Sequence, residues 1–383
     1  MDISLTDTQR EFQERVRRFA ATEIQPVAAD LDRQGICPQE LIDKIGDIGL
    51  LGAFVPAELG GAGADYLSYI LGLEEISRAW ASLSAIISVH NSLVCYPILK
   101  FGSDEQKRRY LPLLTRGKQL GCYAFAEPSA GSDANAIQTT AQADGDSFVL
   151  NGRKAFVTNG RRARIGLVYA LTDPSRGRRG LSVFVVQKDL PGQSVGKLEE
   201  MLGLRAVEMT KLRFESCRVP KANLLGGLNR GFEIAVSTTE TARIDIAAQA
   251  VGIAQACLDE CVAHTKQRRQ FGRPIAEFEA IQWMLADLST EIEAARLLTH
   301  RAATIFEQGG NVTRAGAMAK LFASEVANKA AYHAVQIFGG HGYLKDFPVE
   351  RLFRDARSTT LYEETSEILR LVIGRELARA ATG

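Results

Sequence analysis

The spacing of apolar residues along this 383-residue chain changes twice, and the changes divide it into three parts. Residues 1–118 have a helical pattern, which begins after Thr6 and Gln9, a pair typical of a capping box. Residues 119–228 carry short apolar runs between turn signals, as β-strands do, and residues 229–383 return to long helical patterns. We therefore predict an α+β protein with an N-terminal all-α domain, a middle antiparallel β domain and a C-terminal four-helix bundle.

Turn signals and periodicity also predict individual elements within these domains. The middle domain has turn signals at Asp144-Gly145, Asn151-Gly152, Asn159-Gly160 and Pro191-Gly192. Its predicted strands are the apolar runs 148–150, 155–158, 165–171 and 181–186. The predicted helices of the bundle are at about 232–267, 279–308 and 313–338, with a shorter one from about residue 365.

Charge and composition exclude several classes of function. Charged residues make up 24% of the chain and the formal net charge is +1, so no nucleic-acid partner or polyanionic substrate is implied. The first 20 residues contain four acidic side chains and do not resemble a targeting peptide. No apolar run approaches the ~20 residues of a membrane span. We expect a cytoplasmic protein with no membrane insertion.

The cysteines do not indicate disulfides or a metal site. The six cysteines are scattered without paired spacing, which favours free thiols in a reducing compartment. Cys257, Cys261 and His264 are spaced to share one helical face, but the helix around them is apolar and no fourth ligand is evident. We predict that the chain binds no metal.

Two short segments are the strongest indications of function. Residues 361–368 read Leu-Tyr-Glu-Glu-Thr-Ser-Glu-Ile, and residues 127–133 read Glu-Pro-Ser-Ala-Gly-Ser-Asp. Together they resemble the two signature regions of the acyl-CoA dehydrogenases, a family with the same order of domains. Residues 73–78, 91–93 and 97–102 look most like its short-chain, butyryl-CoA branch. The resemblance covers essentially the whole chain and implies the acyl-CoA dehydrogenase fold with FAD as cofactor.

The resemblance also implies a reaction and a catalytic residue. The reaction is the α,β-dehydrogenation of an acyl-CoA thioester to the 2-enoyl-CoA, with electrons passed through FAD to electron-transfer flavoprotein. Glu363, which follows Tyr362, matches the family's catalytic base. A carboxylate in a water-poor pocket has a raised pKa and is a better base near neutrality. Without the resemblance, Glu363 would be interpreted as an acidic residue in the first turn of a helix.

Three positions bear on how closely the chain follows the family pattern. Glu364 stands where the family has glycine, and its carboxylate could point away, constrict the acyl pocket, meet a polar group of the substrate or couple to Glu363. Ala126 stands where the family has a flavin-bonded Thr or Ser. Some relatives carry the base immediately before the arginine of the first bundle helix. Here that residue is Ala242, so Glu363 is the only candidate.

The flavin site implied by the resemblance is not of the dinucleotide-fold kind, and no Gly-x-Gly-x-x-Gly follows a predicted strand. The implied cofactor-binding residues are Tyr123, Phe125, Ala126, Ser132, Phe156, Thr158, Arg268, Phe271, Glu279, Gln336, Gly339, Gly340, Thr365 and Glu367. Phe156 and Thr158 would contact the flavin ring, and Arg268 would reach the pyrophosphate of a neighbouring subunit's cofactor. A plain β-strand and a solvated basic helix end are the alternatives for these residues. A site shared between chains implies a homo-oligomer, by family analogy a tetramer.

The substrate-binding residues implied by the resemblance are Ser132, Glu240, Arg243, Tyr362 and Glu364. A buried ion pair between Glu240 and Arg243 would account for those two residues nearly as well. Ser84 replaces the arginine that holds the distal carboxylate in glutaryl-CoA members, which argues against that substrate. His90 and Asn91 lie where an acyl pocket could be lined, but a satisfied polar pair within a helix is favoured.

Two other functions are compatible with these patterns. An acyl-CoA oxidase would use the same base and flavin with oxygen as the electron acceptor. A catalytically silent scaffold could have kept the fold, and Glu364 and Ala126 are the residues that favour this alternative.

Overall fold

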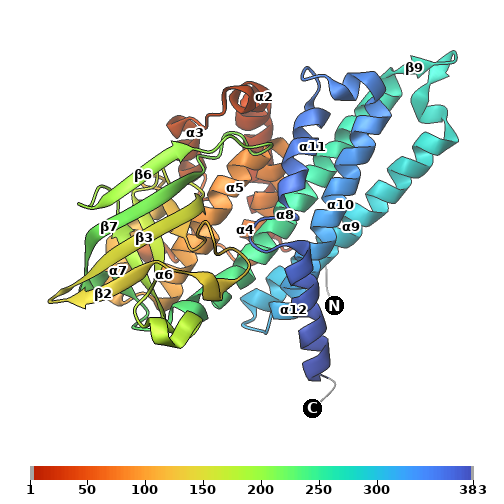
Figure 1. Ribbon diagram of the computed structural model, residues 1–383. Coiled ribbons are helices and arrows are strands. Elements are labelled where there is room, and N and C mark those ends of the chain that lie inside the picture. The colour runs from red at the N-terminus through yellow and green to blue at the C-terminus, as the bar shows by residue number, and fades with distance from the viewer. Residues whose placement is uncertain (1–3, 381–383) are drawn as a thin grey trace.

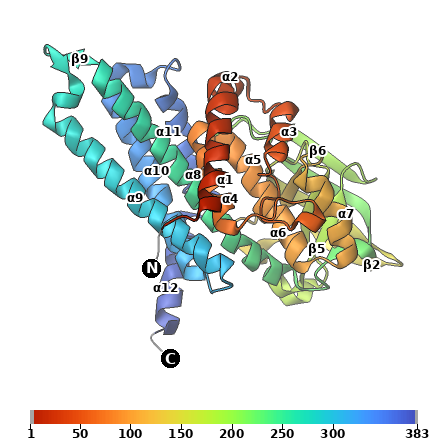
Figure 2. The ribbon, with the colours of Figure 1, turned by 180° about the vertical axis from the view of Figure 1, so that it is seen from behind.

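The computed structural model describes residues 4–380. Residues 1–3, at the start of the segment that we expected not to be a targeting peptide, lie outside the described residues. Figure 1 shows the β-sheet at one end of the molecule and the long helices at the other, with α4 and α5 between them. The same arrangement is seen from behind in Figure 2.

The N-terminal part is helical, as predicted. Its α-helices are α1 (Asp7–Phe19), α2 (Gln25–Gln34), α3 (Gln39–Asp47), α4 (Tyr66–Ala79), α5 (Ala81–His90), α6 (Tyr96–Phe101) and α7 (Asp104–Thr115). The predicted capping box is confirmed, because the Thr6 side chain accepts from the backbone N–H of Gln9 and the Gln9 side chain accepts from that of Thr6. The apolar side of α1 is buried through Phe12 and Val16.

The middle part is an eight-stranded sheet. Its strands are β1 (Gly121–Ala124), β2 (Thr140–Asp144), β3 (Ser147–Val157), β4 (Ile165–Leu171), β5 (Leu181–Gln187), β6 (Gln193–Leu198), β7 (Thr210–Pro220) and β8 (Leu224–Leu225). The strand order is β6-β7-β3-β2-β4-β5-β8, with β1 paired to β4. Most neighbours are antiparallel, as predicted, but β1 runs parallel to β4, and β2 meets β4 in parallel at Thr140 and Leu171.

One predicted turn is wrong. Asn151-Gly152 lies inside β3, where the register with β7 shifts between Leu150 and Gly152. The φ of Gly152 is 153°, and a Cβ there would lie 2.7 Å from the Cα of Thr139. The glycine is therefore explained by a bulge with close backbone packing rather than by a hairpin.

The C-terminal part contains the three predicted long helices and one that was not predicted. Its helices are α8 (Gly231–Gln267), α9 (Glu279–Glu307), α10 (Thr313–Phe338), α11 (Pro348–Ser358) and α12 (Ser366–Ala380). The missed helix is α11, which follows the glycine-rich stretch after α10. In both views α8, α9, α10 and α11 lie side by side, and α8 runs without a break through the 37 residues of its length.

Two helical stretches are long and apolar enough to cross a membrane by length and composition alone, Ala81–Phe101 and Gly231–Gln267. The expectation that no apolar run approaches this length is therefore wrong. The most apolar window of the first stretch is 94% buried inside the protein, and that of the second is 67% buried. Both stretches pack in the core, which accounts for their composition.

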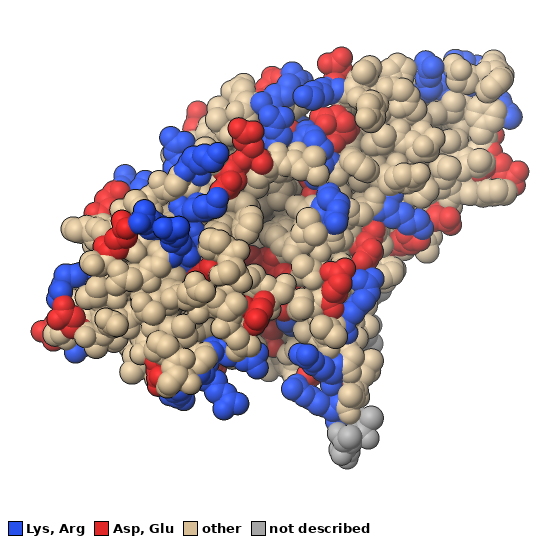
Figure 3. All heavy atoms as spheres, viewed as in Figure 1, with Lys and Arg blue, Asp and Glu red and all other residues tan. Residues whose placement is uncertain are grey.

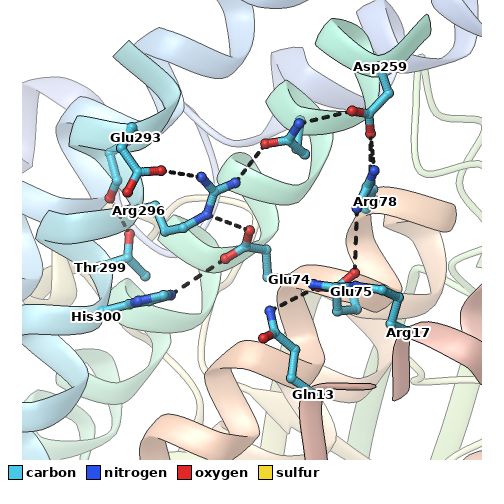
Figure 4. A network of polar contacts seen from close by, with 12 residues as sticks. Gln13, Arg17, Glu74, Glu75, Arg78, Asp259, Glu293, Arg296, Thr299 and His300 are labelled. Atoms are coloured by element: carbon cyan, nitrogen blue, oxygen red, sulfur yellow. Dashed lines mark hydrogen bonds and ion pairs between the residues drawn. The ribbon is translucent and has the colours of Figure 1, made fainter. Parts of the chain in front are cut away.

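Two adjacent buried carboxylates of α4 connect it to helices of both helical parts (Figure 4). Glu74 accepts a 2.9 Å hydrogen bond from Arg296 of α9 and lies 3.6 Å from His300. Glu75 accepts from Arg17 of α1 at 2.8 Å. Burial alone would raise the pKa of Glu74, but His300 and Arg296 outweigh it, so that the pKa lies below its usual value. These charges are therefore paired where they are buried.

A glycine sets the distance between α4 and α8. A Cβ at Gly252 would lie 2.5 Å from the carbonyl oxygen of Glu74 and 2.7 Å from the Cβ of Ser77. We expect Gly252→Leu to force the helices apart and lower the free energy of unfolding by ~1–3 kcal/mol. Urea denaturation measures this change. Gly374→Leu in α12 is the matched control, because a Cβ there meets nothing within 4 Å. Equal stability of the two variants would contradict the expected close packing.

Candidate active site

The loop between α11 and α12 has an unusual backbone at Glu363 and Glu364. The φ angles of these residues are 58° and 137°, in the region that favours glycine. Such conformations persist only where the surroundings hold them, and they are concentrated at functional sites. The φ at Glu364 explains why a glycine would suit this position, and it makes the glutamate there a residue that needs support.

Two buried cations supply that support. Arg243 of α8 forms two hydrogen bonds to the Glu364 carboxylate, from Nε at 2.5 Å and from Nη2 at 3.0 Å. Lys320 of α10 donates from Nζ to the carbonyl oxygen of Tyr362 at 2.7 Å and to that of Glu364. The alternative of an ion pair between Glu240 and Arg243 is wrong, since Arg243 pairs with Glu364. Glu240 instead accepts from the Thr313 hydroxyl at 2.5 Å.

The electrostatic surroundings suit Glu363 to the role of a base. Burial raises its pKa to about 7, the nearby Lys320 opposes this rise, and Glu364 and Asp245 add to it. A carboxyl group with this pKa is about half ionised at neutral pH, the range in which a general base works best. Burial was expected to raise the pKa of Glu363, and Lys320, Glu364 and Asp245 are the charges that adjust it.

Tyr362 continues the polar contacts into the protein core. Its hydroxyl donates to the side-chain oxygen of Gln249 on α8, and the amide of Gln249 donates to Ser84 at 2.9 Å. His90 and Asn91 form the satisfied pair that was predicted: the His90 Nδ1 accepts from the Gly121 backbone, and Asn91 bonds to the backbone of residues 50 and 52.

Lys320 and Gln249 were not among the predicted site residues. The sequence did contain a signal for Lys320, because the small residues Gly316, Ala323 and Ser324 are spaced to share its helical face. The structure buries all three in α10. A lone lysine on such a face is seldom buried without an acceptor. The partners themselves could not be anticipated, because they are 42 and 44 residues away in the chain.

The β domain provides an aromatic wall near the base. The rings of Tyr123 and Phe125 are stacked with centroids 6.1 Å apart, and Tyr169 packs edge-on against both. Tyr123 and Tyr169 each have a pKa raised first by burial, and the charge of Glu363 adds to the rise, so both rings lie within electrostatic reach of the base. On the face of the molecule that Figure 3 shows, the surface is hollowed near the middle.

The residues around β3 fit a flat aromatic cofactor. Phe156 has a φ of 53° and its side chain is 67% exposed, although its neighbours on the strand are buried. Ala155 donates to the carbonyl oxygen of Ala126 at 2.9 Å, which places this strand beside the 123–132 segment. Thr158 is partly exposed on the same strand end. An exposed ring in a strained backbone conformation has the form of a stacking platform.

A buried ion pair supports that segment from behind. Lys154 is fully buried and donates to Glu127 at 2.8 Å and to the carbonyl oxygen of Phe125 at 3.0 Å. Glu127 also accepts from the backbone N–H groups of Gln138 and Thr139. All four contacts fix the turn that carries the predicted flavin residues.

A second group of predicted cofactor residues lies at the far end of the bundle. Arg268 follows α8, and the β9–β10 hairpin (Arg269–Gln270, Arg273–Pro274) carries Phe271, which is 93% exposed. Gly339 and Gly340 follow α10, and a Cβ on either would meet nothing within 4 Å. Gln336 and Glu279 are exposed as well.

The two groups are well separated within one chain. Lys320 touches the loop of the base and Gln336 lies 16 positions later in α10, a distance of about 24 Å along the helix. Figure 1 shows β9 and the upper end of α10 at the same end of the molecule, away from the sheet. The structure therefore does not bring these residues to Glu363 within a single chain.

The remaining predicted residues are placed as follows. Ser132 is exposed in the turn region after β1. Thr365 precedes α12 and its hydroxyl accepts from the backbone of Ile368 at 3.4 Å, while Glu367 is exposed in the first turn. Cys257 and Cys261 are free and buried in the core. In the described part of the chain, no three His, Cys, Asp or Glu side chains are grouped in a way that could hold a metal ion.

Comparison with known proteins agrees with this geometry. Family models of the acyl-CoA dehydrogenases match in chain order: the N-terminal domain at residues 6–118, the middle domain at 122–217 and the C-terminal domain at 229–378. The mitochondrial short-chain specific acyl-CoA dehydrogenase of Mus musculus is 49% identical, with 99% of this chain and 92% of that protein covered.

Solved structures give the same result. The butyryl-CoA dehydrogenase of Megasphaera elsdenii has a TM-score of 0.97 at 40% identity, covering 99% of this chain and all of that one. A chain in the structure described as the electron transferring flavoprotein of Acidaminococcus fermentans has a TM-score of 0.98 at 44% identity, with the same coverage.

The fold, the strained glutamate loop and these matches define a flavoprotein oxidoreductase. The chain belongs to the acyl-CoA dehydrogenase family, whose members use FAD.

Proposed function

We propose that this chain dehydrogenates a short-chain acyl-CoA thioester to the 2-enoyl-CoA, with Glu363 as the catalytic base. The observation that supports this most strongly is the loop of Glu363, where burial raises the pKa of the carboxyl group to about 7 beside the aromatic wall of Tyr123. Short-chain substrates are favoured because relatives that match nearly the whole chain are named as short-chain or butyryl-CoA enzymes.

In this proposal the chain's own residues do four things. Glu363 in its ionised form removes the α-proton of the thioester. Phe156, Thr158 and the 123–132 segment hold the flavin ring, and bound FAD supplies the acceptor for the β-hydride. Tyr362 and Ser132 border the substrate. The Arg243–Glu364 pair and Glu240 shape the wall beside the acyl group. Because Arg243 and Glu364 are paired with one another, they act as part of this wall and not as free charges.

The second group of residues supports a shared site. Arg268, Phe271, Glu279, Gln336, Gly339 and Gly340 are exposed at the far end of the bundle, and we propose that they reach the FAD of a neighbouring subunit in a homotetramer. Thr365 and Glu367 would complete the site at the start of α12. We also propose electron-transfer flavoprotein as the electron acceptor, as the similarity to the Acidaminococcus fermentans structure suggests, and a cytoplasmic location, which the six buried free thiols support.

Anaerobic titration with butyryl-CoA tests the reaction. We expect the flavin absorbance near ~450 nm to bleach on addition of the thioester. Glu363→Gln should bind FAD and stay oxidised, whereas Glu376→Gln in α12, where Glu376 pairs with the exposed Arg379, should bleach like the unaltered protein. A flavin that stays oxidised with butyryl-CoA and with longer, branched and dicarboxylic thioesters would contradict the proposal. Rapid reoxidation by oxygen during turnover would indicate an oxidase.

A further inference from the structure

Lys320 is buried in a way that calls for an explanation. Its side chain is fully buried in α10, although lysine is seldom buried without a charged partner. Both hydrogen bonds that its ammonium group makes go to backbone carbonyl oxygens, those of Tyr362 and Glu364. These carbonyls belong to the residues immediately before and after Glu363. The cation therefore holds the main chain on both sides of the proposed base.

Between these two contacts the backbone has positive φ angles, 58° at Glu363 and 137° at Glu364. L-residues adopt such angles only where other contacts impose them. Lys320 holds the main chain of this loop, and Arg243 holds the side chain of Glu364. The direction of the Glu363 side chain follows from the backbone that these contacts impose.

The charges that face Glu363 come from several elements. Asp245 lies on α8, Lys320 lies on α10, and Glu364 belongs to the same loop, while Arg243 of α8 acts on Lys320. Tyr123 and Tyr169 approach from the sheet as neutral groups, because their pKa values lie above the usual range. Since Arg243 is engaged by Glu364, Lys320 is the cation that favours the ionised form of Glu363.

We propose that Lys320 is a positioning residue for the base. Its ammonium group fixes the left-handed turn at Glu363 through the two flanking carbonyls, and its positive charge favours the ionised form of the base. This inference rests on the proposed role of Glu363 in catalysis.

Two variants separate the two effects. Lys320→Met removes both the charge and the hydrogen bonds, whereas Lys320→Gln removes the charge and keeps a donor. Lys329→Met is the matched control, because Lys329 lies on the same helix and makes a surface ion pair with Glu291. FAD content and thermal unfolding show which variants are folded.

The titration of Glu363 is measured without turnover. Infrared spectra recorded across pH give its carboxyl band, identified as the band missing in Glu363→Gln. We expect both Lys320 variants to raise the midpoint by about one pH unit or more, as the loss of a neighbouring cation does. Lys329→Met should leave the midpoint unchanged.

Kinetics then isolate the positioning effect. At about pH 9 Glu363 is ionised in every variant, and Lys320, whose pKa burial lowers to about 8, is mostly a neutral amine that still donates to both carbonyls. Lys320→Met should still lower kcat by about 10-fold or more at this pH, because a small misplacement of a base is costly. KM for butyryl-CoA should change far less. Lys320→Gln should retain more of kcat at this pH than Lys320→Met.

Three results would overturn the proposal. They are an unchanged midpoint in both Lys320 variants, a high-pH kcat that equals the control, and failure of both variants to fold with FAD, which would give Lys320 a role in stability alone. The infrared midpoint also separates this inference from the proposed function. If no thioester bleaches the flavin while the midpoint shifts, the reaction is wrong and the electrostatic link stands.

Discussion

Glu363→Gln will lower kcat for butyryl-CoA by ~10²–10⁴-fold, the usual contribution of a general base, with FAD binding preserved. Glutamine keeps the size of the side chain and loses only the basic oxygen. In the unaltered protein, kcat will fall as pH drops below about 7, because the pKa of Glu363 is about 7 and the base must be ionised. Stopped-flow reduction of the flavin between pH 5 and 9 measures both effects. A variant that retains more than a tenth of the rate would exclude Glu363 as the base.

The same variant, which lowers kcat, is expected to raise the stability of the fold at high pH. The pKa of Glu363 lies above its ordinary value of 4.5 in the folded chain, so the folded state keeps a proton that the unfolded state releases. The unaltered protein therefore loses stability as pH rises from about 4.5 to 7. The glutamine does not titrate. The stability of Glu363→Gln relative to that of the unaltered protein should therefore be greater at pH 8 than at pH 5. Thermal unfolding at the two pH values measures the difference.

Lys154→Met will destabilise the fold by ~3–5 kcal/mol, because it leaves the buried Glu127 carboxylate without its cation. Burial lowers the pKa of Lys154 to about 8 although Glu127 opposes the shift, so the lysine is charged at neutral pH. The turn from Phe125 to Glu127 also loses its contact with the lysine, and FAD binding should weaken. Urea denaturation of the FAD-loaded protein measures the stability.

Two controls accompany that experiment. The double variant Lys154→Met, Glu127→Gln should recover part of the loss, because no unpaired charge remains in the interior. Lys211→Met removes a surface lysine that pairs with Glu199 at 2.9 Å, and it should cost far less stability because water screens the pair. If Lys154→Met costs no more than Lys211→Met, the buried pair does not support the turn.

The elements predicted correctly are those set by local pattern. The capping box at Thr6 and Gln9, the long helices of the bundle and the fold class were all confirmed. The wrong turn at Asn151-Gly152 shows the limit of local signals, because the same dipeptide serves a bulge when a neighbouring backbone such as that of Thr139 lies close. The parallel pairing of β1 could not be predicted, since the register between distant strands depends on tertiary packing.

The site shows a similar division. Sequence motifs pointed to Glu363 and to the aromatic residues of the β domain, and the charge of Glu363 contributes to the raised pKa of Tyr123. An ion pair between Glu240 and Arg243, three residues apart, was the alternative to a substrate-binding role for both. The partner is Glu364, 121 residues away, because the loop after α11 brings its carboxylate against α8. A partner chosen by tertiary proximity is not visible in spacing.

The unbroken course of α8 limits how this protein can vary in length. The 24 positions from Arg243 to Gln267, the last residue of α8, correspond to about seven turns, so the helix fixes the direction in which the chain leaves for Arg268 and the hairpin. Inserting or deleting one residue between them would rotate the hairpin of Phe271 by about 100° relative to the loop of the base. Substitutions along α8 can accumulate one at a time, whereas a change of length within it would misalign both ends at once.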